Sequence, residues 1–201
     1  NTFSEIGRLT DVGATDWSWG ALIFDFQNDG RKDIFVANGI YQDLTDQDFL
    51  KFVTEENTVQ QIMSNKGDAY KKLVELIPSN PIPNHAFINQ GNLSFKDNAM
   101  ELGLGKPGFS NGSAYGDLDN DGDLDLVVNN VNAPFSLFQN QSRQINPENS
   151  YLKFQLTGVK GNTNAIGTKI TAFVGGEKLY LEHVPIRGFQ STVDPRPNIG
   201  L

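Results

Sequence analysis

The sequence predicts a mainly β protein with two copies of one strand–loop–strand unit, a helical insertion in the first copy and a β-rich C-terminal domain. Three observations predict this fold class. One acidic loop pattern occurs twice, each acidic loop is followed by a short apolar run, and the residues from 149 onward alternate in polarity and then form a predicted hairpin.

Composition limits the classes of protein that the chain can belong to. It has 201 residues, no cysteine and a formal net charge of −8. Disulfides and thiolate metal sites are therefore excluded, and an acidic chain is a poor partner for nucleic acid. No apolar run approaches the ~20 residues that a membrane-spanning helix requires. The acidity is local, because eight aspartates in two loops equal the whole charge excess: Asp25, Asp29, Asp33, Asp117, Asp119, Asp121, Asp123 and Asp125.

The two acidic loops are copies of each other. DFQNDGRKDIFVAN, residues 25–38, aligns with DLDNDGDLDLVVNN, residues 117–130, at an offset of 92 (117 minus 25). The same offset relates Phe3 to Phe95 and Gly20 to Gly112 without a gap. A constant offset over this length indicates an internal repeat, so the two copies should share one local fold.

The first copy contains an insertion. The segments after the loops match at Asn89 and Asn140, which lie 51 residues after Asn38 and 10 residues after Asn130. The first copy is therefore longer by about 41 residues (51 minus 10). We place the insertion at about residues 41–80.

The insertion is predicted to be helical. Phe49, Phe52 and Val53 follow helical spacing, and Thr45 with a carboxylate three residues later resembles a capping box. Gly67-Asp68 should separate two helices, and Pro78 should end the second. The strands that we expect elsewhere are residues 21–24, 33–37, 85–89, 125–128 and 136–140.

The C-terminal segment differs from the repeats because it has no acidic loop. YLKFQL, residues 151–156, alternates with a period of two, and TKITAFV-GG-EKLYLEHV predicts a hairpin around Gly175-Gly176. We expect a domain boundary in the polar stretch at residues 144–149.

The second loop has the spacing of a calcium site. Asp117, Asp119 and Asp121 hold positions one, three and five, Asp123 holds position seven, and Asp125 holds position nine. Alternate side chains of a curling loop converge on one point, and Ca²⁺ prefers six to eight oxygen ligands. Gly122 at position six allows the sharp turn, and position seven usually contributes its carbonyl oxygen.

The loop is not an EF-hand. That motif needs Glu at position twelve and a following helix, whereas position twelve here is Val36 or Val128 and a β-type run follows. Mg²⁺ is disfavoured because it keeps more of its water. We expect the second site to bind more tightly, because the first has Gln27 at position three and the cationic pair Arg31-Lys32. Dissociation constants of about 10⁻⁴–10⁻³ M are usual for extracellular modules.

These loops resemble FG-GAP repeats, also called VCBS repeats, which form the blades of integrin-type β-propellers. The resemblance rests on WSWGALIFDFQNDGRKDIFVANG and FINQGNLSFKDNAMELGL and covers roughly residues 3–140. It implies two Ca²⁺ sites. Their implied ligands are Asp25, Gln27, Asp29, Asp33 and the carbonyl of Arg31 in the first, and Asp117, Asp119, Asp121, Asp125 and the carbonyl of Asp123 in the second.

The C-terminal segment resembles the ASPIC/UnbV domain, which follows FG-GAP repeats in bacterial exported proteins and in a cartilage acidic protein. The matching features are NAIGTKI at 164–170, GFQS at 188–191 and the final IGL. The expected organisation is two FG-GAP/VCBS-like repeats over residues 1–145 and an incomplete ASPIC/UnbV-like domain over 149–201. Because propellers have four to eight blades, two blades suggest part of a longer polypeptide or of an envelope complex.

We expect the chain to bind calcium and to act as a binding or scaffold module that contacts a protein or a glycan. The expected location is extracellular, or at the bacterial outer-membrane surface or periplasm. The alternatives are a calcium-dependent enzyme acting on polysaccharide and a fixed subunit of an outer-membrane assembly. We do not expect an enzyme, because His85 and His183 form no visible triad with a serine. Trp17 and Trp19 could form an aromatic platform for a sugar, but they fit packing within the blade better.

Overall fold

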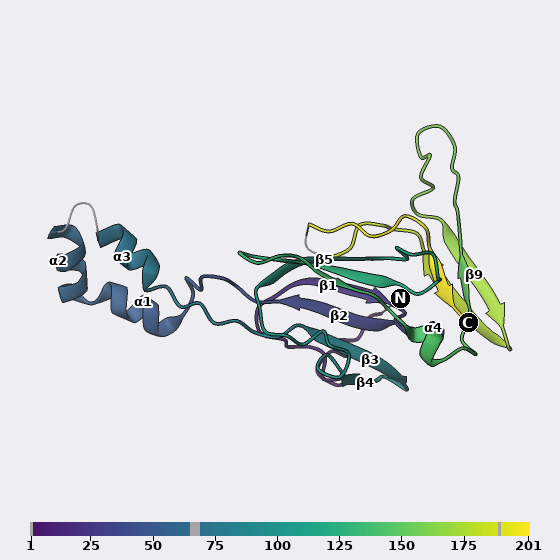
Figure 1. The fold of residues 1–201 in the computed structure, drawn as a ribbon, viewed down its shortest axis with the longest axis horizontal. Helices are drawn as coiled ribbons and strands as arrows, with labels where there is room; N and C mark the ends of the chain where they lie inside the picture. The colour runs from purple at the N-terminus through teal and green to yellow at the C-terminus, as the bar shows by residue number, and fades with distance from the viewer. Residues whose placement is uncertain (1, 65–68, 189) are drawn as a thin grey trace. The chain divides into compact units, whose positions relative to one another are not determined.

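The computed structural model describes residues 2–64, 69–188 and 190–201 (Figure 1). These residues form a mainly β chain, with eleven strands in four sheets and four helices. The chain divides into two compact units, one made of Asn1–Gly39 with Ile82–Leu201 and the other of Ile40–Pro81. None of the described helices is both long and apolar enough to cross a membrane.

Two antiparallel sheets correspond to the two copies of the repeat. The first runs in the order β1 to β4 and the second in the order β5 to β7. Their strands are β1 (Ser18–Phe24), β2 (Asp33–Asn38), β3 (His85–Gly91), β4 (Ser94–Asp97), β5 (Ser110–Gly116), β6 (Asp125–Asn130) and β7 (Ser136–Phe138). Adding 92 to the bounds of β1 and β2 gives the bounds of β5 and β6, so the internal repeat is structural.

The strand register also repeats. The pairs Ser18↔Asn38 and Gly20↔Ala37 around a bulge recur at the same offset as Ser110↔Asn130 and Gly112↔Asn129.

The third strand of each sheet gives the length of the insertion independently. Ile34 pairs with Phe87, whereas its counterpart Leu126 pairs with Phe138. Along the chain, the first pair is separated by 87 minus 34 residues and the second pair by 138 minus 126. The difference between these separations equals the insertion length that the sequence comparison gave. The strand pairing therefore gives the same insertion length as the sequence comparison.

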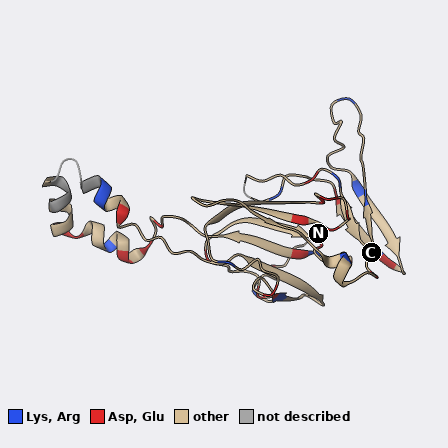
Figure 2. Ribbon diagram, viewed as in Figure 1, with Lys and Arg blue, Asp and Glu red and all other residues tan. Residues whose placement is uncertain are grey.

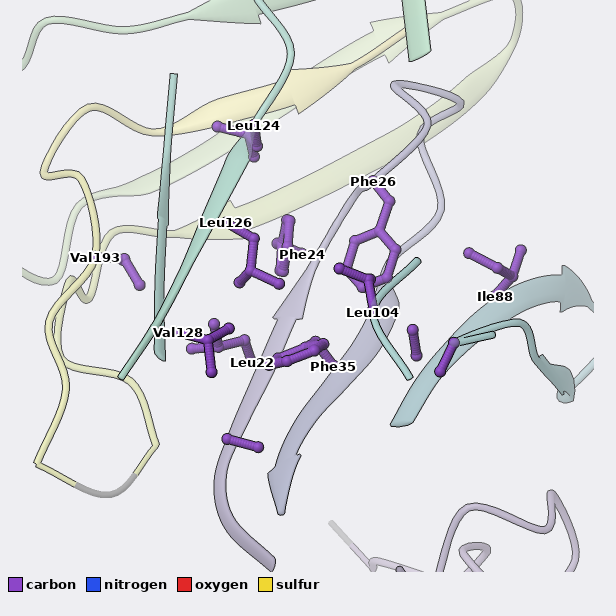
Figure 3. Close-up of a cluster of buried hydrophobic side chains, with 13 residues drawn as sticks. Leu22, Phe24, Phe26, Phe35, Ile88, Leu104, Leu124, Leu126, Val128 and Val193 are labelled. Carbon is purple, nitrogen blue, oxygen red and sulfur yellow. The ribbon is translucent and has the colours of Figure 1, made fainter. Parts of the chain in front are cut away.

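The hydrophobic core lies between the two sheets. Alternate residues of β1 point inward, so Leu22 and Phe24 are buried while Ile23 is half exposed. Leu22 and Phe35 pack near Leu126 and Val128 of the second sheet (Figure 3). Burying each such side chain contributes about 1.5–3 kcal/mol. The core holds the strand ends, and therefore the acidic loops, in fixed positions.

The described residues of the unit Ile40–Pro81 form three helices, α1 (Gln47–Thr54), α2 (Glu56–Ser64) and α3 (Ala69–Glu75). The N-cap of α1 is Asp46, whose Oδ1 accepts a 2.8 Å hydrogen bond from the Phe49 N–H. The predicted cap at Thr45 is therefore wrong: its hydroxyl instead donates to Asp43. The break predicted at Gly67-Asp68 lies outside the described residues.

The C-terminal region adds helix α4 (Ser142–Ile145) and two small sheets. Strands β9 (Lys169–Val174) and β10 (Glu177–Glu182) form the predicted hairpin around Gly175-Gly176, and both glycines have positive φ. Strand β8 (Tyr151–Lys153) pairs with β11 (Asn198–Gly200). Strand β8 is shorter than the alternating run YLKFQL, and its pairing with the chain end was not predicted.

The described residues do not close into a propeller. The blade architecture therefore stays a prediction, although each repeat sheet is an antiparallel meander in which consecutive strands are neighbours.

Candidate metal centre

The two acidic loops have the same backbone conformation. Position four has positive φ in both, 56° at Asn28 and 61° at Asn120, as does position six, 81° at Gly30 and 97° at Gly122. In both loops the N–H of position seven also donates to the carboxylate of position five, at 2.9 Å. Figure 2 shows acidic residues where the strands of the repeats join their loops. The backbone of the two loops therefore follows the same turn.

The second loop brings three carboxylates together. One oxygen each from Asp117, Asp119 and Asp121 lies within 4.8 Å of the others, and this is the one such acidic group among the described residues. Oxygens that share a Ca²⁺ ion at about 2.3–2.6 Å can be separated by up to about 5 Å. The three predicted ligands at positions one, three and five therefore have the spacing of one metal site.

Asp117 is the buried member of this group. Only 2 % of the residue is exposed, and its Oδ1 atom has no hydrogen-bond partner among the described residues. Its Oδ2 atom pairs with the Lys153 ammonium group at 2.6 Å. An unpaired buried carboxylate oxygen costs free energy, so this atom is the one most in need of a cation.

Burial raises the pKa of at least one acid in each loop. Burial, followed by the nearby Asp123 and Asp119 charges, raises the pKa of Asp121, while a hydrogen bond from Gln139 lowers the pKa of Asp119. In the first loop, burial raises the pKa of Asp25 to about 6, although three backbone N–H groups oppose the rise. A raised pKa means that the ionised carboxylate is disfavoured in its surroundings.

The acids at position nine, Asp33 and Asp125, accept hydrogen bonds from two separate parts of each repeat. Asp33 accepts from the N–H groups of Phe26 and Asn89 at 2.9 and 2.8 Å. Asp125, its copy in the second loop, accepts from Leu118 and Asn140 at 3.0 and 2.9 Å. Each carboxylate therefore joins the start of its loop to the end of the third strand. Burial raises the pKa of Asp33 to about 7. The prediction that both acids also bind metal stays a prediction.

Position seven has another structural role. The Asp123 carboxylate is fully buried and accepts from the Asn28 side chain at 2.8 Å and from the Arg143 N–H at 2.9 Å. The Asn28 amide also donates to the Gly122 carbonyl at 3.3 Å, so the two acidic loops touch. The carbonyl ligands predicted at Arg31 and Asp123 stay predictions.

The position-one acid of the first loop is satisfied by its own loop. Asp25 accepts from the N–H groups of Gln27, Asp29 and Gly30. The Arg31 guanidinium lies 3.8 Å from Asp29. The acids of this loop do not form a metal-binding group within the described residues. The predicted order of the two affinities therefore stays a prediction, while the geometry favours the second loop as the place for a metal ion.

Residues from Asn149 onward contact both loops. Lys153 of β8 reaches Asp117, Asn198 of β11 donates to the Gly122 carbonyl at 3.2 Å, and Asn149 donates to the Gln27 carbonyl at 2.9 Å. A Cβ atom at Gly122 would overlap the Tyr151 ring. Sequence reasoning missed these residues, because none of them belongs to the repeat.

The two pairs of residues considered for other chemistry lie elsewhere. His85 pairs with Asp97 at 2.6 Å, and His183 is hydrogen-bonded to the Asn164 carbonyl at 3.1 Å. Trp17 and Trp19 are both partly buried, with ring centroids 6.4 Å apart.

Comparison with known proteins identifies one segment of the chain. Residues 158–201 match the family model described as ASPIC and UnbV. This segment contains the β9–β10 hairpin and strand β11, whose Gly200 lies against Asp25 and Asn28 of the first loop. No curated protein sequence matches the chain. The resemblance of the C-terminal domain is thus shown over residues 158–201.

Proposed function

We propose that this chain is a calcium-stabilised extracellular or cell-envelope module that binds or scaffolds a protein or a glycan. Its two repeats would be FG-GAP/VCBS-type blades, each fastened by an acidic loop. The observation that carries the proposal is the group Asp117, Asp119 and Asp121, which places three carboxylate oxygens within 4.8 Å.

The donor set supports calcium over softer metals. The candidate ligands are carboxylate oxygens, and hard cations such as Ca²⁺ prefer oxygen. A second sign is the buried Oδ1 atom of Asp117, which has no hydrogen-bond partner among the described residues although Lys153 pairs with Oδ2. When bound, the ion would cancel the repulsion among these acids and hold the turn between β5 and β6.

Calcium binding would stabilise the fold without any catalytic step. An ion that binds only the folded chain stabilises it by about 2.7 kcal/mol at one hundred times its dissociation constant. For a chain of this size, 1 kcal/mol raises Tm by about 2–4 °C. Ca²⁺ at saturating concentration should therefore raise Tm by several degrees.

The test is thermal melting with and without Ca²⁺. The double variant Asp119→Ala/Asp121→Ala should lose most of the calcium-dependent rise in Tm. The matched control Glu101→Ala/Glu177→Ala removes two exposed acids outside the loops and should keep the rise. An equal calcium response in both variants, or none in the unmodified chain, would exclude the proposed site. A glycan array would then separate sugar binding from protein binding.

A further inference from the structure

The position-one acid of the second loop already has a cationic partner from another part of the fold. The Lys153 ammonium group lies 2.6 Å from Asp117 Oδ2, and the two residues are 36 positions apart. The Lys153 side chain is 16 % exposed and the Asp117 side chain 1 %. This ion pair is therefore mostly shielded from water, where charge interactions are stronger than at the surface.

The same carboxylate is the best-placed metal ligand. Its Oδ1 atom is buried and has no hydrogen-bond partner within the described part of the chain. Asp117 is also one of the three acids whose carboxylates converge. A dication on one oxygen and an ammonium group on the other would share a single carboxylate. Two positive charges at that separation repel each other strongly in a partly buried site.

We propose that Lys153 and a divalent metal ion compete for Asp117, so that Lys153 lowers the calcium affinity of the second loop. This inference rests on the proposed calcium site. Lysine suits the role because its ammonium group is a compact charge on a flexible stem, which can move away when the ion binds.

The competition links the metal to the C-terminal strands. Lys153 is the last residue of β8, and β8 pairs with β11 inside the same sheet. By thermodynamic reciprocity, if Lys153 weakens metal binding, then metal binding weakens the hold of Lys153 on Asp117 by the same factor. Metal occupancy of the loop therefore loosens one contact of the strand that covers it.

Calorimetric calcium titrations of three variants test the effect on affinity. Lys153→Met should bind Ca²⁺ about tenfold more tightly than the unmodified chain, because a nearby positive charge is removed. Lys153→Arg keeps the charge and should change the affinity by less than about threefold. Lys169→Met removes an exposed lysine of β9 and measures the effect of net charge alone; it should change the affinity by less than about twofold.

Lysine acylation of the unmodified chain gives a readout that needs no variant. Saturating Ca²⁺ should raise the acylation rate of Lys153 several-fold, measured by mass spectrometry, while Lys169 in the same sample stays constant. If Ca²⁺ raises Tm but leaves Lys153 acylation unchanged or slower, or if Lys153→Met binds like Lys169→Met, the competition is wrong. If Ca²⁺ neither binds nor raises Tm, the proposed calcium site itself is wrong.

Discussion

At the scale of single residues, the two position-nine acids explain why the loops have a fixed shape. Asp33 and Asp125 are almost fully buried, and both oxygens of each accept backbone N–H groups. Replacing such a carboxylate by an amide puts an N–H₂ donor opposite an N–H donor, which leaves both without an acceptor.

We expect Asp125→Asn to destabilise the chain by about 1–3 kcal/mol, because it leaves a buried backbone donor unsatisfied. Urea unfolding in the presence of a calcium chelator measures this loss. Asp119→Asn, at an exposed position of the same loop, should cost far less under these conditions. A loss for Asp125→Asn that appears only with Ca²⁺ would instead identify Asp125 as a metal ligand without the clamping role.

Gly122 provides a second test at this scale. Its φ of 97° strains any residue with a Cβ atom, and that atom would also overlap the Tyr151 ring. Gly161 has the same φ of 97° but no heavy atom within 4 Å of its Cβ position. Gly161→Ala therefore measures the backbone strain alone, about 1 kcal/mol.

Gly122→Ala should cost at least about 2 kcal/mol more than Gly161→Ala, because overpacking adds to the strain. Urea unfolding midpoints of the two variants give this difference. Equal midpoints would mean that Tyr151 does not pack on the loop.

At the scale of elements, the sequence predicted features that have a local pattern and missed strands that have none. The offset of 92 and the length of the insertion follow from local matches, and strand register reproduces both. Strand β5 was missed because SNGSAYG has no apolar alternation, although its copy β1 implied it. Strand β11 was missed because its pairing with β8 depends on the tertiary fold.

The helical unit should be separable from the repeats. None of the residues in the described core cluster comes from Ile40–Pro81. A single glycine can replace this whole segment. The number of residues from Asn38 to Asn89 then equals the number from Asn130 to Asn140 in the second copy. We expect the shortened chain to melt cooperatively, with a Tm within about 4 °C of the full chain, which corresponds to about 1–2 kcal/mol.

Circular dichroism and thermal melting check this prediction. The helical signal should fall while the calcium-dependent rise in Tm is unchanged. Loss of the cooperative transition would show that the helical unit stabilises the repeat sheets.

At the scale of the whole molecule, the site belongs to two regions of sequence at once. The repeats provide the acids, and the C-terminal region provides Lys153, Tyr151 and Asn198. Sequence spacing could find the acids because they follow a period within one short segment. It could not find Lys153, because a contact between residues 117 and 153 has no local pattern and depends on how the sheets pack.

The central claim is that the second acidic loop holds one Ca²⁺ ion. An anomalous difference map from a crystal grown in millimolar calcium tests it most directly. We predict a peak within about 2.3–2.6 Å of oxygens from Asp117, Asp119 and Asp121, with the Lys153 ammonium group moved away from Asp117. An ordered loop with no peak, and with Lys153 still paired to Asp117, would contradict it.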